Sequence, residues 1–195
     1  MVRIIAGEFR SRQLLTLRND ESTRPVLSRV KESMFSMLHE WFAGARVLDL
    51  FAGVGTIGLE AVSRGAAEVL MVEKSARTHR ILKQNIERLG CGDRARAMHA
   101  DALGRTCLLA APRPADLVFV DPPYAMMEEQ RARQRILDQA GRCREVMADR
   151  GFLVLRSPRG PDDFDLAIAD FLGPEPHRYR KDMWVLIYEP SRQED

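Results

Sequence analysis

The sequence predicts an α/β fold, a doubly wound and mostly parallel seven-stranded sheet, on three observations. From residue 45 onward, short apolar runs of strand length alternate with amphipathic helical segments, the order typical of βαβ units. A glycine-rich turn joins the first of these strands to a helix. The run ADLVFV at 115–120 is apolar apart from Asp116, which favours a central strand covered on both faces.

For residues 1–44, the sequence predicts an N-terminal extension that consists of a β-hairpin followed by a helix. VRIIA and RQLLTL read as two short strands joined by a turn, and residues 27–42 place apolar side chains three or four positions apart. Residues 1–31 contain seven basic residues and only three acidic ones. This excess favours phosphate binding, although a solvated basic surface would account for it equally well.

Residues 45–195 predict the catalytic core of a single domain. A helix begins near Ser75 as its N-cap and ends at Gly90, and the polar, arginine-rich stretch 128–149 predicts another helix. A segment broken by proline and glycine separates the last two strands. The predicted strands are ARVLDLF, AEVLMVE, ARAMHA, ADLVFVD, GFLVLR and MWVLIYE.

One acidic residue stands at the end of each of four successive predicted strands: Asp49, Glu73, Asp101 and Asp121. In a doubly wound sheet, ligands bind beyond the carboxyl ends of the strands, near the point where the strand order reverses. We therefore expect these carboxylates to surround a ligand site.

The stretch DLFAGVGTIG contains Gly53-x-Gly55-x-x-Gly58, with Glu73 following Gly53 by 20 residues. This spacing matches a dinucleotide-binding fingerprint, in which backbone N–H groups meet pyrophosphate. Asp49 argues against that ligand because a carboxylate in front of the loop repels phosphate. S-adenosylmethionine suits the carboxylate better, since its amino group and sulfonium are cationic. A tight turn without any ligand is the plainest alternative.

The stretch DPPY, Asp121 to Tyr124, is the more specific motif. Pro122 and Pro123 fix two φ angles and remove two N–H donors, so hydrogen-bond acceptors dominate there. The Asp121 side chain and the Pro122 carbonyl suit the hydrogens of an exocyclic amino group, while Tyr124 suits stacking on its ring. A capped turn with a packed aromatic ring is the alternative.

Several classes of protein are disfavoured. No stretch approaches the roughly 20 apolar residues of a membrane span, and no signal peptide is evident, so we expect a cytoplasmic protein without a membrane role. Three dispersed cysteines show no zinc-ligand spacing, and we expect no metal. The four histidines lie in separate elements, which disfavours a hydrolase triad.

The chain resembles the class I S-adenosylmethionine-dependent methyltransferases with a Rossmann-like fold, and among them the RsmD family of bacterial 16S rRNA guanine-N2 methyltransferases. Four motifs carry the resemblance in order along nearly the whole chain: RIIAGEFRSRQL, TRPVLSRVKESMFSML, VLDLFAGVGTIGLEAVSRGA and FVDPPY. Together they are far more specific than any one alone.

The resemblance implies S-adenosyl-L-methionine as cofactor and a guanine of 16S rRNA as substrate, within the small ribosomal subunit or an assembly intermediate whose proteins can form part of the recognised surface. It implies a catalytic set, a cofactor-binding set and an RNA-binding set. These are Asp121, Pro122, Pro123 and Tyr124; Asp49, Phe51, Gly53, Gly55, Glu73, Asp101 and Ala102; and Arg10, Arg12, Arg24, Arg29 and Lys31. Within the last set, the resemblance implies that Arg10 and Arg12 contact phosphates, and that Arg24, Arg29 and Lys31 contact RNA or help to order the site.

Two positions depart from the family pattern. Ser11 replaces a common glycine in the hairpin, and Arg156 replaces a common acidic residue after the fifth strand, where we expect it to alter local surface charge. Other functions also stay open: methylation of adenine N6 or of a protein glutamine, an NAD-linked oxidoreductase, and a noncatalytic RNA-binding assembly factor.

Overall fold

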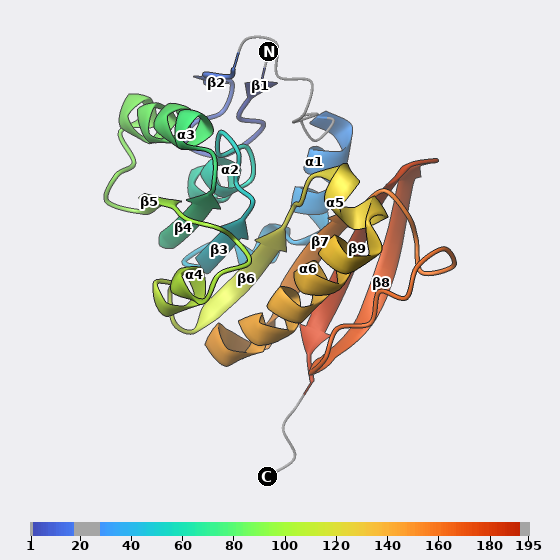
Figure 1. The fold of residues 1–195 in the computed structure, drawn as a ribbon. Helices are drawn as coiled ribbons and strands as arrows, with labels where there is room; N and C mark the ends of the chain where they lie inside the picture. The colour runs from blue at the N-terminus through green and yellow to red at the C-terminus, as the bar shows by residue number, and fades with distance from the viewer. Residues whose placement is uncertain (1, 18–27, 192–195) are drawn as a thin grey trace.

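The structure, a computed structural model, describes residues 2–17 and 28–191 and contains one large sheet flanked by helices (Figure 1). Seven strands form this sheet in the order β5-β4-β3-β6-β7-β9-β8. The five neighbouring strands β5, β4, β3, β6 and β7 pair in parallel, whereas β9 is antiparallel to both of its neighbours. The strands are β3 (Arg46–Leu50), β4 (Glu68–Glu73), β5 (Ala95–His99), β6 (Ala115–Val120), β7 (Met147–Ser157), β8 (Phe171–Arg180) and β9 (Met183–Pro190). The predicted doubly wound sheet is confirmed.

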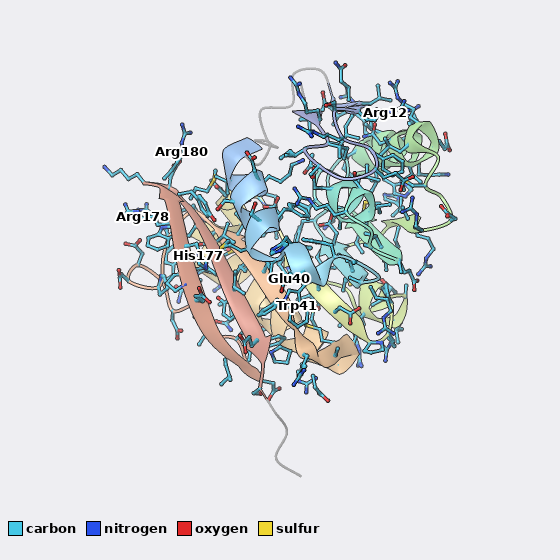
Figure 2. The ribbon with its side chains drawn as sticks, turned by 180° about the vertical axis from the view of Figure 1, so that it is seen from behind. Arg12, Glu40, Trp41, His177, Arg178 and Arg180 are labelled. Carbon is cyan, nitrogen blue, oxygen red and sulfur yellow. The ribbon has the colours of Figure 1, made fainter. Side chains whose placement is uncertain are left out.

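Helices cover both faces of the sheet and form two apolar cores with it. In Figure 1, α6 lies in front of the sheet, and in the reverse view of Figure 2, α1 does. One face carries α1 (Ser28–Met37), α2 (Gly58–Ser63) and α3 (Ala76–Leu89); the other carries α4 (Arg105–Leu109), α5 (Tyr124–Glu128) and α6 (Gln130–Arg142). Strand side chains pointing either way are therefore buried, which explains the continuously apolar strands.

The ends of the helices follow local signals. Ser75 caps α3, its Oγ accepting a hydrogen bond of 3.3 Å from the Thr78 N–H, and Gly90 ends the helix with φ at 68°, as predicted. The helix predicted over 27–42 is shorter, because α1 gives way to a 3₁₀ turn, η1 (His39–Trp41). Another 3₁₀ turn, η2 (Cys143–Val146), follows α6, so the helix predicted at 128–149 is also shorter.

The edge strand β8 lies where the sequence predicts no strand. Pro174 and Pro176 interrupt it, and proline cannot donate to the hydrogen-bond ladder of a sheet. Because β8 is the outermost strand, only its β9 side needs partners. The prolines are compatible with an edge but misleading as a sequence signal.

The predicted N-terminal hairpin is confirmed: β1 (Val2–Arg3) pairs antiparallel with β2 (Gln13–Leu14). The hairpin docks on the end of α2, where the backbone oxygen of Ser63 accepts a 2.7 Å hydrogen bond from the Glu8 N–H. Gly7 lies so close that a Cβ would stand 1.8 Å from the same oxygen. Ser11 has a φ of 67°, a left-handed conformation that favours glycine, which accords with the family's usual residue there.

A buried carboxylate joins this hairpin to the helices. Glu60 of α2 is completely buried and accepts hydrogen bonds from the N–H groups of Ile5 and Ala6, at 2.8 and 3.0 Å. Two cations also contact it, Lys31 of α1 at 3.0 Å and Arg64 at 3.1 Å. A carboxylate without these partners would be costly to bury.

We expect Glu60→Ala to reduce the free energy of unfolding by about 3–5 kcal/mol, because the variant leaves buried cations and amides unpaired. Urea denaturation followed by tryptophan fluorescence measures this loss. Glu60→Ala combined with Lys31→Met should recover part of it, since the double variant removes both buried charges.

The matched control is Glu87→Ala, on the exposed side of α3. An exposed glutamate should contribute little to stability. Equal losses in Glu60→Ala and Glu87→Ala would contradict the anchoring role of Glu60.

Candidate active site

The topology brings the four predicted carboxylates to one edge of the sheet. Asp49, Glu73, Asp101 and Asp121 belong to the carboxyl ends of β3, β4, β5 and β6, which are adjacent parallel strands. The strand order reverses between β3 and β6, since β4 and β5 extend the sheet on the other side of β3. Ligands bind at such reversals in doubly wound sheets.

Two of these carboxylates hold the glycine loop between β3 and α2. The Gly58 N–H donates to Asp49 Oδ2 at 2.9 Å, and the Gly53 N–H donates to Glu73 Oε2 at 3.0 Å. The other oxygen of Glu73 accepts from the Ser75 N–H at 2.6 Å. The loop is thus tied to β3 on one side and to the end of β4 on the other.

Left-handed backbone conformations shape this loop. Phe51, Gly53 and Gly55 have φ angles of 63°, 58° and 91°. A Cβ on Gly55 would stand 2.6 Å from the side chain of Leu82, whereas a Cβ on Gly53 would meet nothing within 4 Å. Gly53 therefore faces open space, where its backbone can approach a ligand. Phe51 is strained for a non-glycine residue, as is common at binding sites.

Asp49 has an unused acceptor. Its side chain is fully buried, and Oδ1 has no hydrogen-bond donor in the part of the chain that the structure describes. Burial raises the pKa of Asp49 well above its ordinary value, and the nearby carboxylates of Asp121 and Glu73 raise it further. A cationic donor would satisfy Oδ1 and favour the ionised carboxylate.

Asp101 lies at the outer end of the carboxylate row. Lys74 donates to its Oδ2 at 2.8 Å, which lowers the pKa of Asp101, and the Leu103 N–H donates to Oδ1 at 3.0 Å. Ala102, which lies between Asp101 and Leu103 in the chain, is buried. The loop after β5 is therefore ordered beside the end of β4.

The DPPY motif follows β6, the neighbour of β3, and the glycine loop follows β3. Asp121 continues β6, its N–H donating to the Leu50 oxygen at 3.3 Å, and Tyr124 begins α5. Pro122 is buried, and its carbonyl accepts no hydrogen bond from the described residues. Burial raises the pKa of Asp121, while the guanidinium of Arg156 opposes the rise.

The expected surface role of Arg156 is wrong. Its side chain is only 12% exposed and forms an ion pair with Asp121, and its guanidinium carbon lies 5.1 Å from the centre of the Tyr124 ring. The register of β6 and β7 explains this, because Val120 pairs with Leu155. The next residues, Asp121 and Arg156, therefore meet at the site.

The predicted RNA-binding residues divide into three groups. Arg10 and Arg12 are exposed on the hairpin, and Figure 2 shows Arg12 at that side of the molecule. Arg24 and the side chain of Arg29 lie outside the described residues. Lys31 is 3% exposed and contacts Glu60, which favours the second of its two expected roles, ordering the site, over contact with RNA.

Lys31 also links separate parts of the fold. Its ammonium group donates to the backbone oxygens of Arg3 in β1 and Thr56 in the glycine loop, at 3.3 and 3.4 Å. Burial lowers the pKa of Lys31, and Glu60 counteracts this effect. The hairpin and the glycine loop thus share one buried cation.

Comparisons with known proteins agree with this architecture. The family model described as Conserved hypothetical protein 95 matches residues 2–162. The chain is 38% identical to ribosomal RNA small subunit methyltransferase D of Haemophilus influenzae over 128 residues, 63% of this chain and 64% of that protein. It is 33% identical to YlbH of Bacillus subtilis over 160 residues, 81% of this chain and 83% of that protein. The chain belongs to the RsmD family.

A solved structure described as the putative methyltransferase yhhF from Escherichia coli superposes with a TM-score of 0.78 at 27% identity, covering 98% of this chain and 99% of that one. The fold is therefore that of the class I methyltransferases. The alignment with the Haemophilus influenzae protein spans just under two thirds of that relative's length. Every predicted catalytic and cofactor-binding residue falls within the part that the RsmD family model matches, whereas β8 and β9 lie beyond it.

The described residues lack two features, a cluster of metal ligands and a membrane-spanning helix. Within residues 2–17 and 28–191, no group of three or more histidine, cysteine, aspartate or glutamate side chains could hold a metal ion. No helix in these same ranges is long and apolar enough to cross a membrane.

The raised pKa of Asp49 makes the stability of the ligand-free protein depend on pH. Because the folded state binds this proton more tightly than the unfolded state, the free energy of unfolding should decrease as the pH rises from the ordinary aspartate range through the raised pKa. Asp49→Asn should weaken this decrease and be more stable than the parent above that pKa. Urea denaturation at a series of pH values measures both effects.

Asp138→Asn is the matched control, because Asp138 is exposed on α6. Its pH profile should follow that of the parent. If Asp49→Asn does so too, the carboxyl of Asp49 does not titrate at a raised pKa.

Proposed function

We propose that the protein is an S-adenosylmethionine-dependent methyltransferase that methylates the exocyclic N2 of a guanine in 16S rRNA of the small ribosomal subunit. Membership of the RsmD family and the class I methyltransferase fold support this activity. The names of the relatives supply the small-subunit rRNA substrate.

The placement of DPPY carries the proposal. Asp121 and Tyr124 follow β6, and the glycine loop follows its neighbour β3, so a cofactor over the loop and a base at the motif would meet at the strand reversal. The hydrogen bond from Asp121 to Leu50 holds the two strand ends together. A methyl donor and an acceptor nitrogen require this kind of close positioning.

The residues around the loop suit S-adenosylmethionine better than NAD. The unused Oδ1 of Asp49 fits the cationic methionine end, whereas a pyrophosphate would face a buried carboxylate. The open space at Gly53 allows close approach. Glu73 is fixed by two amides and retains lone pairs for ribose hydroxyls, while Asp101 and Ala102 would lie beside the adenine.

The Gly53 and Gly55 amides are already used inside the protein. The Gly53 N–H donates to Glu73, and the Gly55 N–H donates to the Ala52 oxygen at 2.9 Å. These glycines therefore contribute backbone shape and room for the ligand, rather than their own N–H groups.

Asp121 would act on the acceptor amine. The lone pair of guanine N2 is delocalised into its ring, so the free amine is a poor nucleophile. Carboxylate and carbonyl oxygens from Asp121 and Pro122 would accept the N2 hydrogens, while Tyr124 stacks on the ring. S-adenosylmethionine, when bound, supplies an electrophilic methyl group and leaves as a neutral thioether. N2 then loses one proton.

The exposed hairpin would bind the RNA backbone. Arg10 and Arg12 are exposed there, and Figure 2 shows Arg178 and Arg180 on the β8 side of α1, opposite Arg12. Cations on both sides of α1 suit an extended phosphate chain. The target base must leave its stack to reach DPPY.

The activity is tested by incubating the protein and methyl-labelled S-adenosylmethionine with small subunits from cells that lack the gene. We expect N2-methylguanine at one position of 16S rRNA, and the same position should be unmodified in the mutant cells. Unchanged small-subunit rRNA in both experiments would contradict the substrate. Binding of NAD but not of S-adenosylhomocysteine would contradict the cofactor.

Asp121→Asn should lower kcat for this methylation by about 10²–10³-fold, because it removes a charged acceptor from the amine. Binding of S-adenosylhomocysteine, measured by calorimetry, should stay within a few-fold of the parent value. Asp138→Asn on α6 is the control and should retain full activity. A parent-like rate in Asp121→Asn would remove Asp121 from the reaction and favour a noncatalytic assembly role.

Arg10→Ala combined with Arg12→Ala should raise KM for small subunits with little change in kcat, since these residues are expected to contact phosphates. The dependence of KM on salt should also weaken, because fewer counterions are released on binding. Arg131→Ala combined with Arg135→Ala, on the exposed side of α6, is the control pair. Equal KM changes in both pairs would show that the hairpin has no special role.

A further inference from the structure

Arg156 introduces a buried positive charge into the proposed guanine site. It lies in β7, immediately beside the end of β6, and its Nε donates to Asp121 Oδ1. Both side chains are nearly buried, at 12% and 13% exposure. A guanidinium held this way is far from the solvated surface on which most arginines lie.

Among the described residues, the pair leaves one donor and one acceptor without partners. Arg156 Nη1 is buried and forms no hydrogen bond with any described residue. Asp121 Oδ2 likewise accepts no hydrogen bond from residues 2–17 or 28–191. Buried donors without partners are rare in native proteins, so a guanidinium nitrogen with no partner among the described residues, beside the carboxylate of Asp121, points to a ligand atom.

The hydrogen-bonding edge of guanine matches this arrangement. The amino nitrogen N2 carries two hydrogens and the ring nitrogen N1 carries one, and O6 next to N1 is an acceptor. A carboxylate followed by a guanidinium offers acceptors for the first two positions and a donor for the third. Arginine is also the residue that most often contacts guanine O6 in nucleic-acid recognition.

We propose that Arg156 is a specificity-determining residue that donates to O6 of the target guanine, while Asp121 accepts the N1 and N2 hydrogens. This role depends on the proposed function, since it assigns a contact within the same site. Adenine would be rejected because its ring nitrogen N1 accepts rather than donates, and its amino group would face the guanidinium.

The charges around Asp121 are consistent with this role. Arg156 faces it from β7 and Asp49 from β3, while the Tyr124 ring of α5 lies against Arg156. Burial favours the neutral form of Asp121, and among these groups only Arg156 is a cation. The guanidinium therefore also helps to keep both oxygens of Asp121 available as acceptors.

The test compares the parent with Arg156→Gln on two substrates: small subunits reconstituted with guanine, or with 2,6-diaminopurine, at the mapped target position. Diaminopurine keeps the N2 amino group but lacks O6 and the N1 hydrogen. We expect the parent to lose about 10- to 100-fold in kcat/KM on diaminopurine, the discrimination that a good arginine contact provides. The substitution Arg156→Gln should lower kcat/KM on guanine by a similar factor. On diaminopurine it should lower kcat/KM little below the value of the parent.

The difference between the effects of Arg156→Gln on the two bases separates base recognition from a structural effect, because a structural loss would lower kcat/KM equally on both bases. Arg156→Lys, which keeps the charge but not the forked donor, should recover part of the guanine preference. Arg159→Gln, an exposed residue that pairs with Glu128, is the control and should keep the parent preference. Binding of S-adenosylhomocysteine and urea denaturation check that each variant folds.

Two results would overturn the assignment of Arg156. The losses from Arg156→Gln and from diaminopurine could multiply, which would show no contact between them. Arg156→Gln could instead methylate guanine faster with a lower KM, which would show that the guanidinium occupies the place of the base. A parent enzyme that leaves guanine-bearing subunits unmethylated would refute the proposed function itself.

Discussion

The buried carboxylate of Glu60 is the interaction on which the arrangement of the N-terminal half depends. It needs several donors at once, and it takes them from the hairpin strand, from α1 through Lys31, and from Arg64. Because Lys31 also contacts Thr56, the segment proposed to bind RNA and the loop proposed to bind cofactor are held by one buried network. Such networks strengthen each member when every partner is present.

The site itself follows from parallel topology. Strand ends that are far apart in the sequence become neighbours at one edge, and each carboxylate there has a different environment. Backbone amides hold Asp49 and Glu73, a lysine neutralises Asp101, and a guanidinium pairs with Asp121. Environment rather than residue type therefore separates the three carboxylates proposed to hold the cofactor from the one proposed to act on the base.

Most of the fold could be predicted because its signals are local. Apolar runs, the Ser75 cap and the left-handed Gly90 each depend on a few neighbouring residues. The prediction failed where distant residues decide the outcome. Lys31 is buried because Glu60 lies 29 positions later in the chain, and Arg156 turns inward because of the β6 and β7 register. Charge pattern alone cannot distinguish such residues from exposed cations.

The prolines of β8 have a consequence for the whole molecule. A sheet edge exposes unpaired backbone groups that can recruit strands from other molecules, which is a common route to aggregation. Pro174 and Pro176 remove two N–H donors from this outer strand, so the edge is a poor template for another chain. The prolines that concealed β8 in the sequence thus also disfavour the pairing of neighbouring copies along this edge.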